Sequence, residues 1–168
     1  MDAPAGLGFI VDIIVALMLI FSFIGGLKEG AVKEFLNLVA MLLALALTGY
    51  FMGYVTAWFN FIPDVNWRGL LGFAITLMII LIVLGLLFWP LRAMVEKGWN
   101  GGALWSILGG IFGVMGTAIG LIVLVRLFDV YPVFDWLTTV FRSSQILNWL
   151  VSHIGPLLMM LPGAMRYI

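Results

Sequence analysis

Long apolar segments separated by short groups of charged residues make up most of this sequence. Four such segments cover about residues 7–27, 35–59, 69–91 and 102–125. Asp12 interrupts the first segment, and Trp89 with Pro90 is expected to end the third. Because a helix needs about 20 apolar residues to cross about 30 Å of hydrocarbon, the pattern predicts four transmembrane helices. The short connections predict that helices adjacent in sequence pack antiparallel to each other.

A different pattern follows the fourth apolar segment. Three residues break up the apolar run there: Asp129, Pro132 and Asp135. Over about 142–154, Gln145, Asn148 and Ser152 share one helical face and apolar residues share the other. This pattern predicts an amphipathic helix in the membrane interface, ended by Gly155-Pro156. A re-entrant hairpin using 157–165 is the alternative.

Composition places the chain among membrane proteins. Its mean hydropathy is +1.22, with 64% hydrophobic and 10% charged residues, whereas soluble domains average about 25% charged residues. We therefore expect an all-α integral membrane protein, with a bundle of four transmembrane helices over 1–127 and a C-terminal amphipathic interfacial segment over 128–168. A net charge of zero without a Lys/Arg cluster excludes the usual basic surface of a nucleic-acid-binding protein.

The distribution of basic residues predicts the orientation. Lys28, Lys33, Arg92 and Lys97 lie in the first and third loops, whereas the second loop carries Arg68. Cytoplasmic loops are richer in Lys and Arg. We therefore expect the first and third loops in the cytoplasm and both termini outside it.

A stripe of small residues runs along the fourth segment. Steps of three and four residues relate its members: Gly102, Ser106, Gly109, Gly113, Gly116 and Gly120. Glycine inside a helix costs about 1 kcal/mol relative to alanine in water. In a bilayer, small residues at this spacing let helix backbones approach closely. The stripe predicts a packing face.

Asp12 and Arg126 form a candidate charge pair, in contact directly or through water. If the first helix began at Asp12, the fifteen residues of 13–27 would extend about 22 Å and would be too short to cross the membrane. Asp12 is therefore expected below the surface, where an unpaired charge is costly. Arg126 ends the fourth segment on the same side of the membrane. In the alternative, the two side chains do not pair and each reaches the lipid headgroups independently.

The sequence offers few residues for catalysis or metal binding. His153 is the single histidine, whereas a zinc site needs three or four ligands. His153 as an axial ligand of a haem-type metal is a secondary alternative. The sequence contains neither a nucleophile elbow nor a phosphate-binding loop. We expect no enzyme activity, no cofactor and no metal.

Three short motifs resemble the colicin V production protein family. The first combines Asp12, Gly30, Lys33 and Glu34; the second is the glycine-rich run 108–113; the third is the run 144–147. The resemblance implies a small bacterial inner-membrane protein with four spans, acting in bacteriocin production or export and in envelope homeostasis. Trp105-Ser106 and Gly116-Thr117 stand where family members carry charged residues.

Three functions remain open. In the first, the chain acts in export or envelope homeostasis through packing with partner membrane proteins or with itself. In the second, it is an accessory subunit of a large membrane complex. In the third, it forms an oligomeric channel. A channel needs polar groups along its path. Within the spans, besides Asp12, the candidates are Asn37, Thr48, Thr76 and Thr117. Membrane lipids are expected partners in every case.

Overall fold

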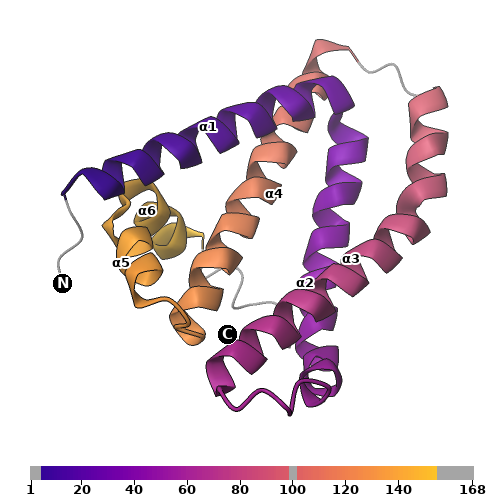
Figure 1. Ribbon diagram of the computed structural model, residues 1–168. Helices are drawn as coiled ribbons and strands as arrows, with labels where there is room; N and C mark the ends of the chain where they lie inside the picture. Colours follow the sequence, from indigo (N-terminus) through magenta and orange to yellow (C-terminus); the bar gives the residue numbers. More distant parts are fainter. Residues whose placement is uncertain (1–4, 99–101, 155–168) are drawn as a thin grey trace.

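The computed structural model describes residues 5–98 and 102–154, which form helices joined by short turns (Figure 1). The helices are α1 (Ala5–Glu29), α2 (Ala31–Ala57), α3 (Val65–Gly98), α4 (Ala103–Val130), α5 (Asp135–Ser143) and α6 (Gln145–His153). The first four are long and apolar enough to cross a membrane. The predicted fold class, a multi-pass helical membrane protein with a C-terminal helix, is confirmed.

The third helix is longer than predicted. The expected end at Trp89-Pro90 is wrong, because α3 continues through Pro90 to Gly98. Proline removes one backbone donor and crowds the preceding turn, and in a membrane helix this bends the helix more often than it ends it. Figure 1 shows that α3 bends in its C-terminal part. Arg92, predicted in a loop, therefore lies on a helix.

Two short helices replace the single helix expected over 142–154. Ser144 has an extended backbone and separates α5 from α6. The predicted faces of α6 are confirmed, since Leu147 and Leu150 are 2% and 4% exposed and its polar residues are exposed. The apolar face of α6 is buried against α1 and α4. The hairpin over 157–165 lies outside the described residues.

The four long helices do not pair in sequence order. The most extensive contacts join α1 with α4, α2 with α3, and α2 with α4, whereas α1–α2 and α3–α4 contacts are few. The prediction that sequential helices pack antiparallel is therefore wrong for two of the three pairs. In Figure 1, α1 and α2 meet at a corner, and α2 stands between α4 and the C-terminal part of α3.

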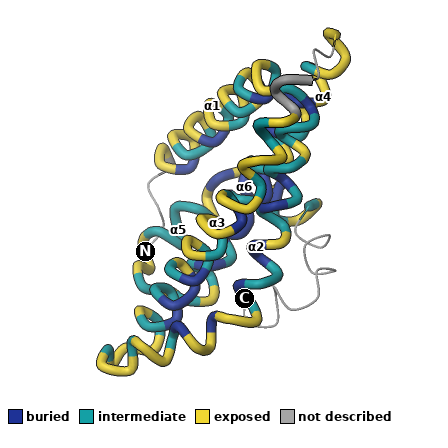
Figure 2. The backbone as a smooth tube through the Cα atoms, turned by 90° about the vertical axis from the view of Figure 1, so that its right-hand side faces the viewer, coloured by how far each residue is buried: buried dark blue, intermediate teal, exposed yellow. Residues whose placement is uncertain are grey.

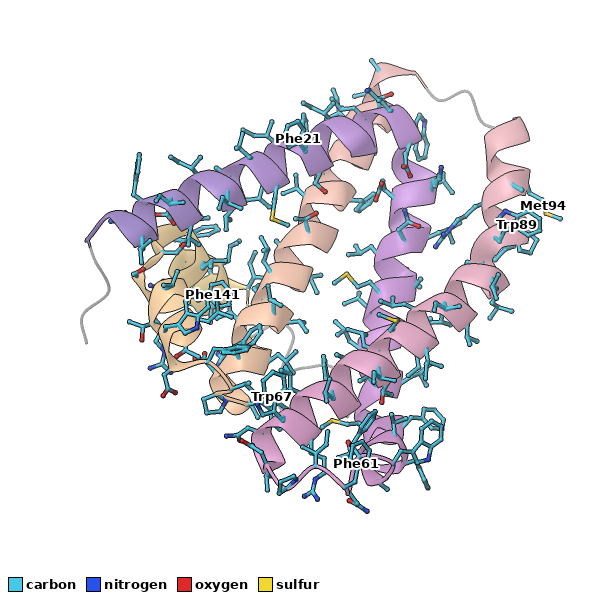
Figure 3. All side chains as sticks on the ribbon, viewed as in Figure 1. Phe21, Phe61, Trp67, Trp89, Met94 and Phe141 are labelled. Atoms are coloured by element: carbon cyan, nitrogen blue, oxygen red, sulfur yellow. The ribbon has the colours of Figure 1, made fainter. Side chains whose placement is uncertain are left out.

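The central helix is α4. Of its most apolar window 44% is buried, compared with 11% for α1, whose exposed positions are visible in Figure 2. Ile122 of α4 has no exposed surface and lies in a core that α1, α2, α3 and α6 complete. The outer surface is apolar as well: Phe21, Trp89 and Met94 are 67%, 70% and 71% exposed (Figure 3). Such a surface is suited to contact with lipid.

A single glycine makes the corner between α1 and α2. Gly30 has φ 84° and ψ 161°, a backbone conformation that other residues rarely adopt. Its N–H donates to the Gly26 carbonyl at 2.9 Å, and its carbonyl accepts from Glu34 at 3.2 Å. The connection expected around 28–34 therefore consists of one residue, and the two helices diverge from it.

Replacing Gly30 by alanine should lower the free energy of unfolding by about 1–3 kcal/mol, because the backbone there is strained for any side chain. A β-carbon at Gly30 would meet no atom within 4 Å, so a steric clash does not contribute. Gly25, which is also open to a β-carbon but lies inside α1, is the control. Gly25→Ala should be neutral or stabilising. Unfolding in detergent micelles measures both, and equal effects would contradict the assignment.

Candidate functional site

Asp12 of α1 binds the N-terminus of α6. The Ser144 hydroxyl donates to Asp12 Oδ1 at 2.5 Å, and the Ile146 N–H donates to the same oxygen at 3.0 Å. The Gln145 N–H donates to Asp12 Oδ2 at 3.3 Å. The Ser144 hydroxyl also accepts from the Leu147 N–H at 3.1 Å, as an N-cap does. Two helices far apart in sequence thus share one capping arrangement, which we call the Asp12–Ser144 clasp.

The clasp gives Asp12 different direct partners from the one expected from the sequence. Arg126 makes no hydrogen bond or ion pair with Asp12, nor with any other residue in the described ranges. The unpaired N–H groups and the positive end of the dipole at a helix N-terminus stabilise a carboxylate without a cation. A direct Asp12–Arg126 pair is therefore not formed, and a contact through water stays a prediction. The expectation that Asp12 needs a partner is met by α6.

Helices α1 and α4 approach each other at glycines. A β-carbon on Gly109 would lie 2.7 Å from the Gly30 carbonyl carbon and 3.0 Å from the Ala31 nitrogen. A β-carbon on Gly113 would lie 2.7 Å from the Ser22 carbonyl oxygen. Both glycines are buried. No side chain fits at these positions, so backbone lies directly against backbone.

The six residues of the predicted stripe divide into three groups. Gly109 and Gly113 contact α1, and a β-carbon on Gly120 would lie 3.3 Å from the Met41 side chain of α2. Gly102 and Gly116 have nothing within 4 Å of such a carbon. Ser106 is half-buried. The packing face therefore covers the middle of the stripe, because α1 ends beside Gly109 and crosses α4 there.

Two glycines of this contact lie off the predicted stripe. A β-carbon on Gly26 of α1 would lie 2.9 Å from Gly110 Cα, and one on Gly110 would lie 2.6 Å from the Phe23 ring. Gly26 is buried. The Gly25-Gly26 pair near the end of the first apolar segment could have indicated the α1 side of this contact from the sequence, since small residues are needed on both sides of a close helix contact.

A hydroxyl pair strengthens the same interface. Ser22 Oγ donates to the Gly113 carbonyl at 2.9 Å and lies 2.5 Å from Thr117 Oγ1. Thr117 therefore points toward α1. The fully buried Thr48 donates to the Ala44 carbonyl of its own helix at 2.7 Å. Thr48 and Thr117, two of the residues considered for a channel, are therefore hydrogen-bonded within the protein.

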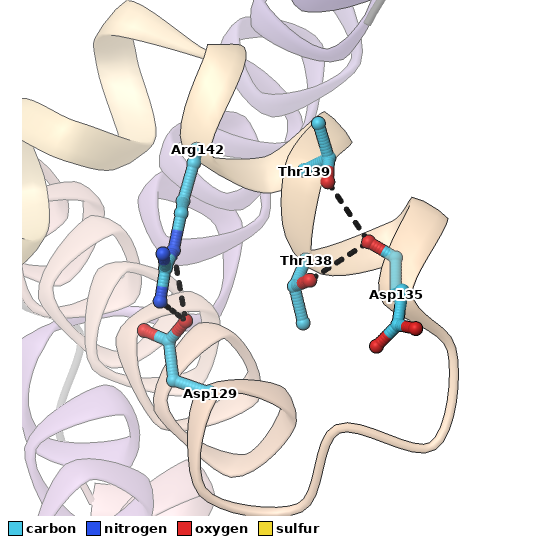
Figure 4. Close-up of polar contacts among 5 residues, drawn as sticks. All are labelled: Asp129, Asp135, Thr138, Thr139 and Arg142. Atoms are coloured by element: carbon cyan, nitrogen blue, oxygen red, sulfur yellow. Dashed lines mark hydrogen bonds and ion pairs between the residues drawn. The ribbon is translucent and has the colours of Figure 1, made fainter. Parts of the chain in front are cut away.

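Ion pairs hold the ends of the helices. Lys33 Nζ lies 3.4 Å from Glu29 Oε2, across the Gly30 corner. Arg142 of α5 donates to Asp129 Oδ1 through Nη2 at 3.0 Å and through Nε at 3.2 Å (Figure 4). The Arg142–Asp129 pair ties α5 to the last turn of α4 and so keeps α6 next to Asp12.

His153 lies at the exposed end of α6. Its ring stacks on Trp149 with centroids 4.9 Å apart and an angle of 21° between the planes. Its Nδ1 lies 2.9 Å from Ser152 Oγ and 3.0 Å from the Trp149 carbonyl. No group of three His, Cys, Asp or Glu side chains among the described residues could hold a metal ion. An axial-ligand role for His153 stays a prediction.

Most of this geometry lies in a part of the chain that matches a known protein family. The model of the colicin V production protein family matches residues 11–155, most of the chain. The chain belongs to this family. Both partners of the Asp12–Ser144 clasp, the Gly30 corner and the glycine contact lie inside the matched range. No curated protein and no solved structure shows a significant match.

The α1–α4 contact predicts that alanine has opposite effects on stability at two glycines of α4. Gly109→Ala should destabilise the protein by about 1–3 kcal/mol, because overpacking forces the backbones apart. Gly116→Ala should be neutral or stabilise by up to about 1 kcal/mol, because alanine favours the helix and the site is open. Thermal unfolding in detergent tests both variants. Similar shifts of the midpoint would show that the two positions are equivalent.

Removing either side of the clasp should release α6. We expect Asp12→Ala and Ser144→Ala each to cost about 1–3 kcal/mol, and the double variant to cost less than their sum. Protease sensitivity of 144–153 should rise in parallel with the loss of stability. Glu29→Gln, which removes a partly exposed carboxylate from the same helix, should cost a few tenths of a kcal/mol. Strictly additive losses would argue against the clasp.

Proposed function

We propose that this protein serves export or envelope homeostasis in a bacterial inner membrane, as a non-enzymatic packing partner of other membrane proteins. Membership of the colicin V production protein family supports the cellular setting. Four apolar helices with short connections support a role inside the bilayer, because they leave little of the chain for an aqueous domain.

An apolar groove between α3 and α4 carries the proposal. It encloses about 530 Å³, and its lining includes Ala74, Leu77, Met78, Gly120, Val123 and Leu124. The groove exists because α3 packs along α2 and makes few contacts with α4. Ala74 is exposed, and Met78 is 62% exposed.

A transmembrane helix of a partner protein suits this groove. Helices associate in lipid through close packing, and small residues such as Ala74 and Gly120 let a second backbone approach. The lining contains no charged side chain, so the partner helix needs none. If the protein is instead an accessory subunit of a large complex, it would use the same surface. The two functions differ in the number of partner chains.

The oligomeric channel has less support. Thr48 and Thr76 donate to carbonyls of their own helices, and Thr117 lies at hydrogen-bond distance from Ser22. These hydroxyls serve helix packing and leave few polar groups for an ion path. For orientation, the distribution of basic residues supports the first and third loops in the cytoplasm and both termini outside it.

Filling the groove should remove partner binding without unfolding the protein. In cells that lack their own copy, the wild-type protein should restore bacteriocin release or resistance to detergent, and should retain a stoichiometric membrane partner in mild detergent. Ala74→Trp should lower partner recovery about tenfold or more, equivalent to at least 1.4 kcal/mol, and should abolish the restored phenotype. Quantitative mass spectrometry of the purified complex measures the recovery.

Ala103→Trp is the matched control, because Ala103 is also exposed on a long helix and does not line the groove. It should behave like the wild type. A second copy of this chain as the retained partner would replace the heteromeric proposal by self-association. Equal partner recovery and equal phenotype for both tryptophan variants would contradict a role for the groove.

A further inference from the structure

A second hollow lies at the end of α2 beside the start of α3. It encloses about 400 Å³, and its lining includes Gly49, Tyr50, Gly53, Thr56, Asn60 and Arg68. Most of these residues follow one face of α2, and Arg68 faces them from the first turn of α3. The hollow is separate from the Asp12–Ser144 clasp and shares no lining residue with the α3–α4 groove.

Arg68 has no ion-pair partner among the residues that the structure describes. It is half-buried, and no carboxylate in the described ranges lies within ion-pair distance of it. Its Nη1 donates to Asn60 Oδ1 at 3.4 Å. The nearby Asp64 uses its Oδ1 to accept from the N–H groups of Asn66 and Trp67, at 2.8 Å and 3.3 Å. A guanidinium partly withdrawn from water is stabilised by an anion, so this position favours an anionic ligand.

The rest of the hollow is open and largely apolar. Gly49 and Gly53 are four residues apart and present no side chain, and a β-carbon on Gly53 would meet nothing within 4 Å. Tyr50 lines the hollow and is 65% exposed. Trp58 and Phe61, at the same end of α2, are 70% and 78% exposed. Aromatic residues of this kind gather at the headgroup level of membranes, so the basic end of the hollow lies at that level.

We propose that this hollow binds a phospholipid with an anionic headgroup. The phosphate accepts hydrogen bonds from the guanidinium of Arg68 and from the amide NH₂ of Asn60, and an acyl chain lies along the surface that Gly49 and Gly53 leave open. Arginine suits this role because its planar donors match phosphate oxygens in pairs. A free phosphate ion would use the basic end alone and would leave the apolar part of the hollow unoccupied.

The test compares lipids with an anionic headgroup and lipids with a zwitterionic headgroup. Purified protein in mild detergent is titrated with phosphatidylglycerol, with phosphatidylcholine of the same chains, or with inorganic phosphate, and native mass spectrometry counts the bound lipid. The wild type should prefer phosphatidylglycerol. Arg68→Gln should weaken its binding about tenfold, because a hydrogen-bonded charge pair is lost. Arg68→Lys should retain part of the affinity, since it keeps the charge without the planar donors.

Two further variants separate the site from general charge and from misfolding. Gly53→Leu fills the hollow and keeps Arg68, so it should also lose phosphatidylglycerol binding while circular dichroism shows unchanged helicity. Lys28→Gln removes one positive charge from an exposed position outside the hollow and should bind like the wild type. Equal losses for Lys28→Gln and Arg68→Gln, equal binding of the two lipids, or displacement of the lipid by millimolar phosphate would overturn the proposal.

Discussion

The close approach of α1 and α4 is the constraint on which the rest of this structure depends. Gly109 lies against Gly26 and beside the Gly30 corner, and neither Gly109 nor Gly26 has room for a side chain. In a bilayer, hydrophobic burial does not distinguish a neighbouring helix from lipid, so packing and hydrogen bonds must supply the preference. Backbone contact at the glycines and the Ser22 hydroxyl bond to the Gly113 carbonyl provide both.

The position of α2 and of α6 follows from this contact. Because Gly30 ends α1 beside Gly109, α2 starts there and descends along α4 and α3, away from α1. At its other end α1 diverges from α4, and α5 and α6 fill the space between them. At this end of α1, the partly exposed Asp12 meets the buried Ser144. Their hydrogen bonds satisfy a carboxylate and a helix N-terminus together, either of which would be costly if left unpaired.

The two surfaces proposed for binding lie on the opposite side of this arrangement, where α3 is involved. Since α3 packs mainly on α2, it leaves an apolar groove beside α4, and near the turn into α3 it leaves a hollow with the half-buried Arg68. Both surfaces are consequences of incomplete packing among four helices. The groove is suited to an apolar partner helix, whereas the charge of Arg68 would favour an anion in the proposed lipid site.

Apolar length determined the number and approximate position of the spans from the sequence alone, because hydrocarbon thickness sets the length that a helix must have. Local periodicity likewise predicted the faces of α6, and the family motifs pointed to Asp12, Gly30 and 144–147. Tertiary structure decided which helices pack together.

Apolar helices present similar surfaces to all neighbours, so the sequence could not show that α1 pairs with α4. Nor could it show which members of the glycine stripe form the contact. The position of Asp12 in an apolar segment predicted that it needs a partner. Whether a cation or a helix N-terminus met that need depended on α6 packing against α1, a contact between residues 132 positions apart.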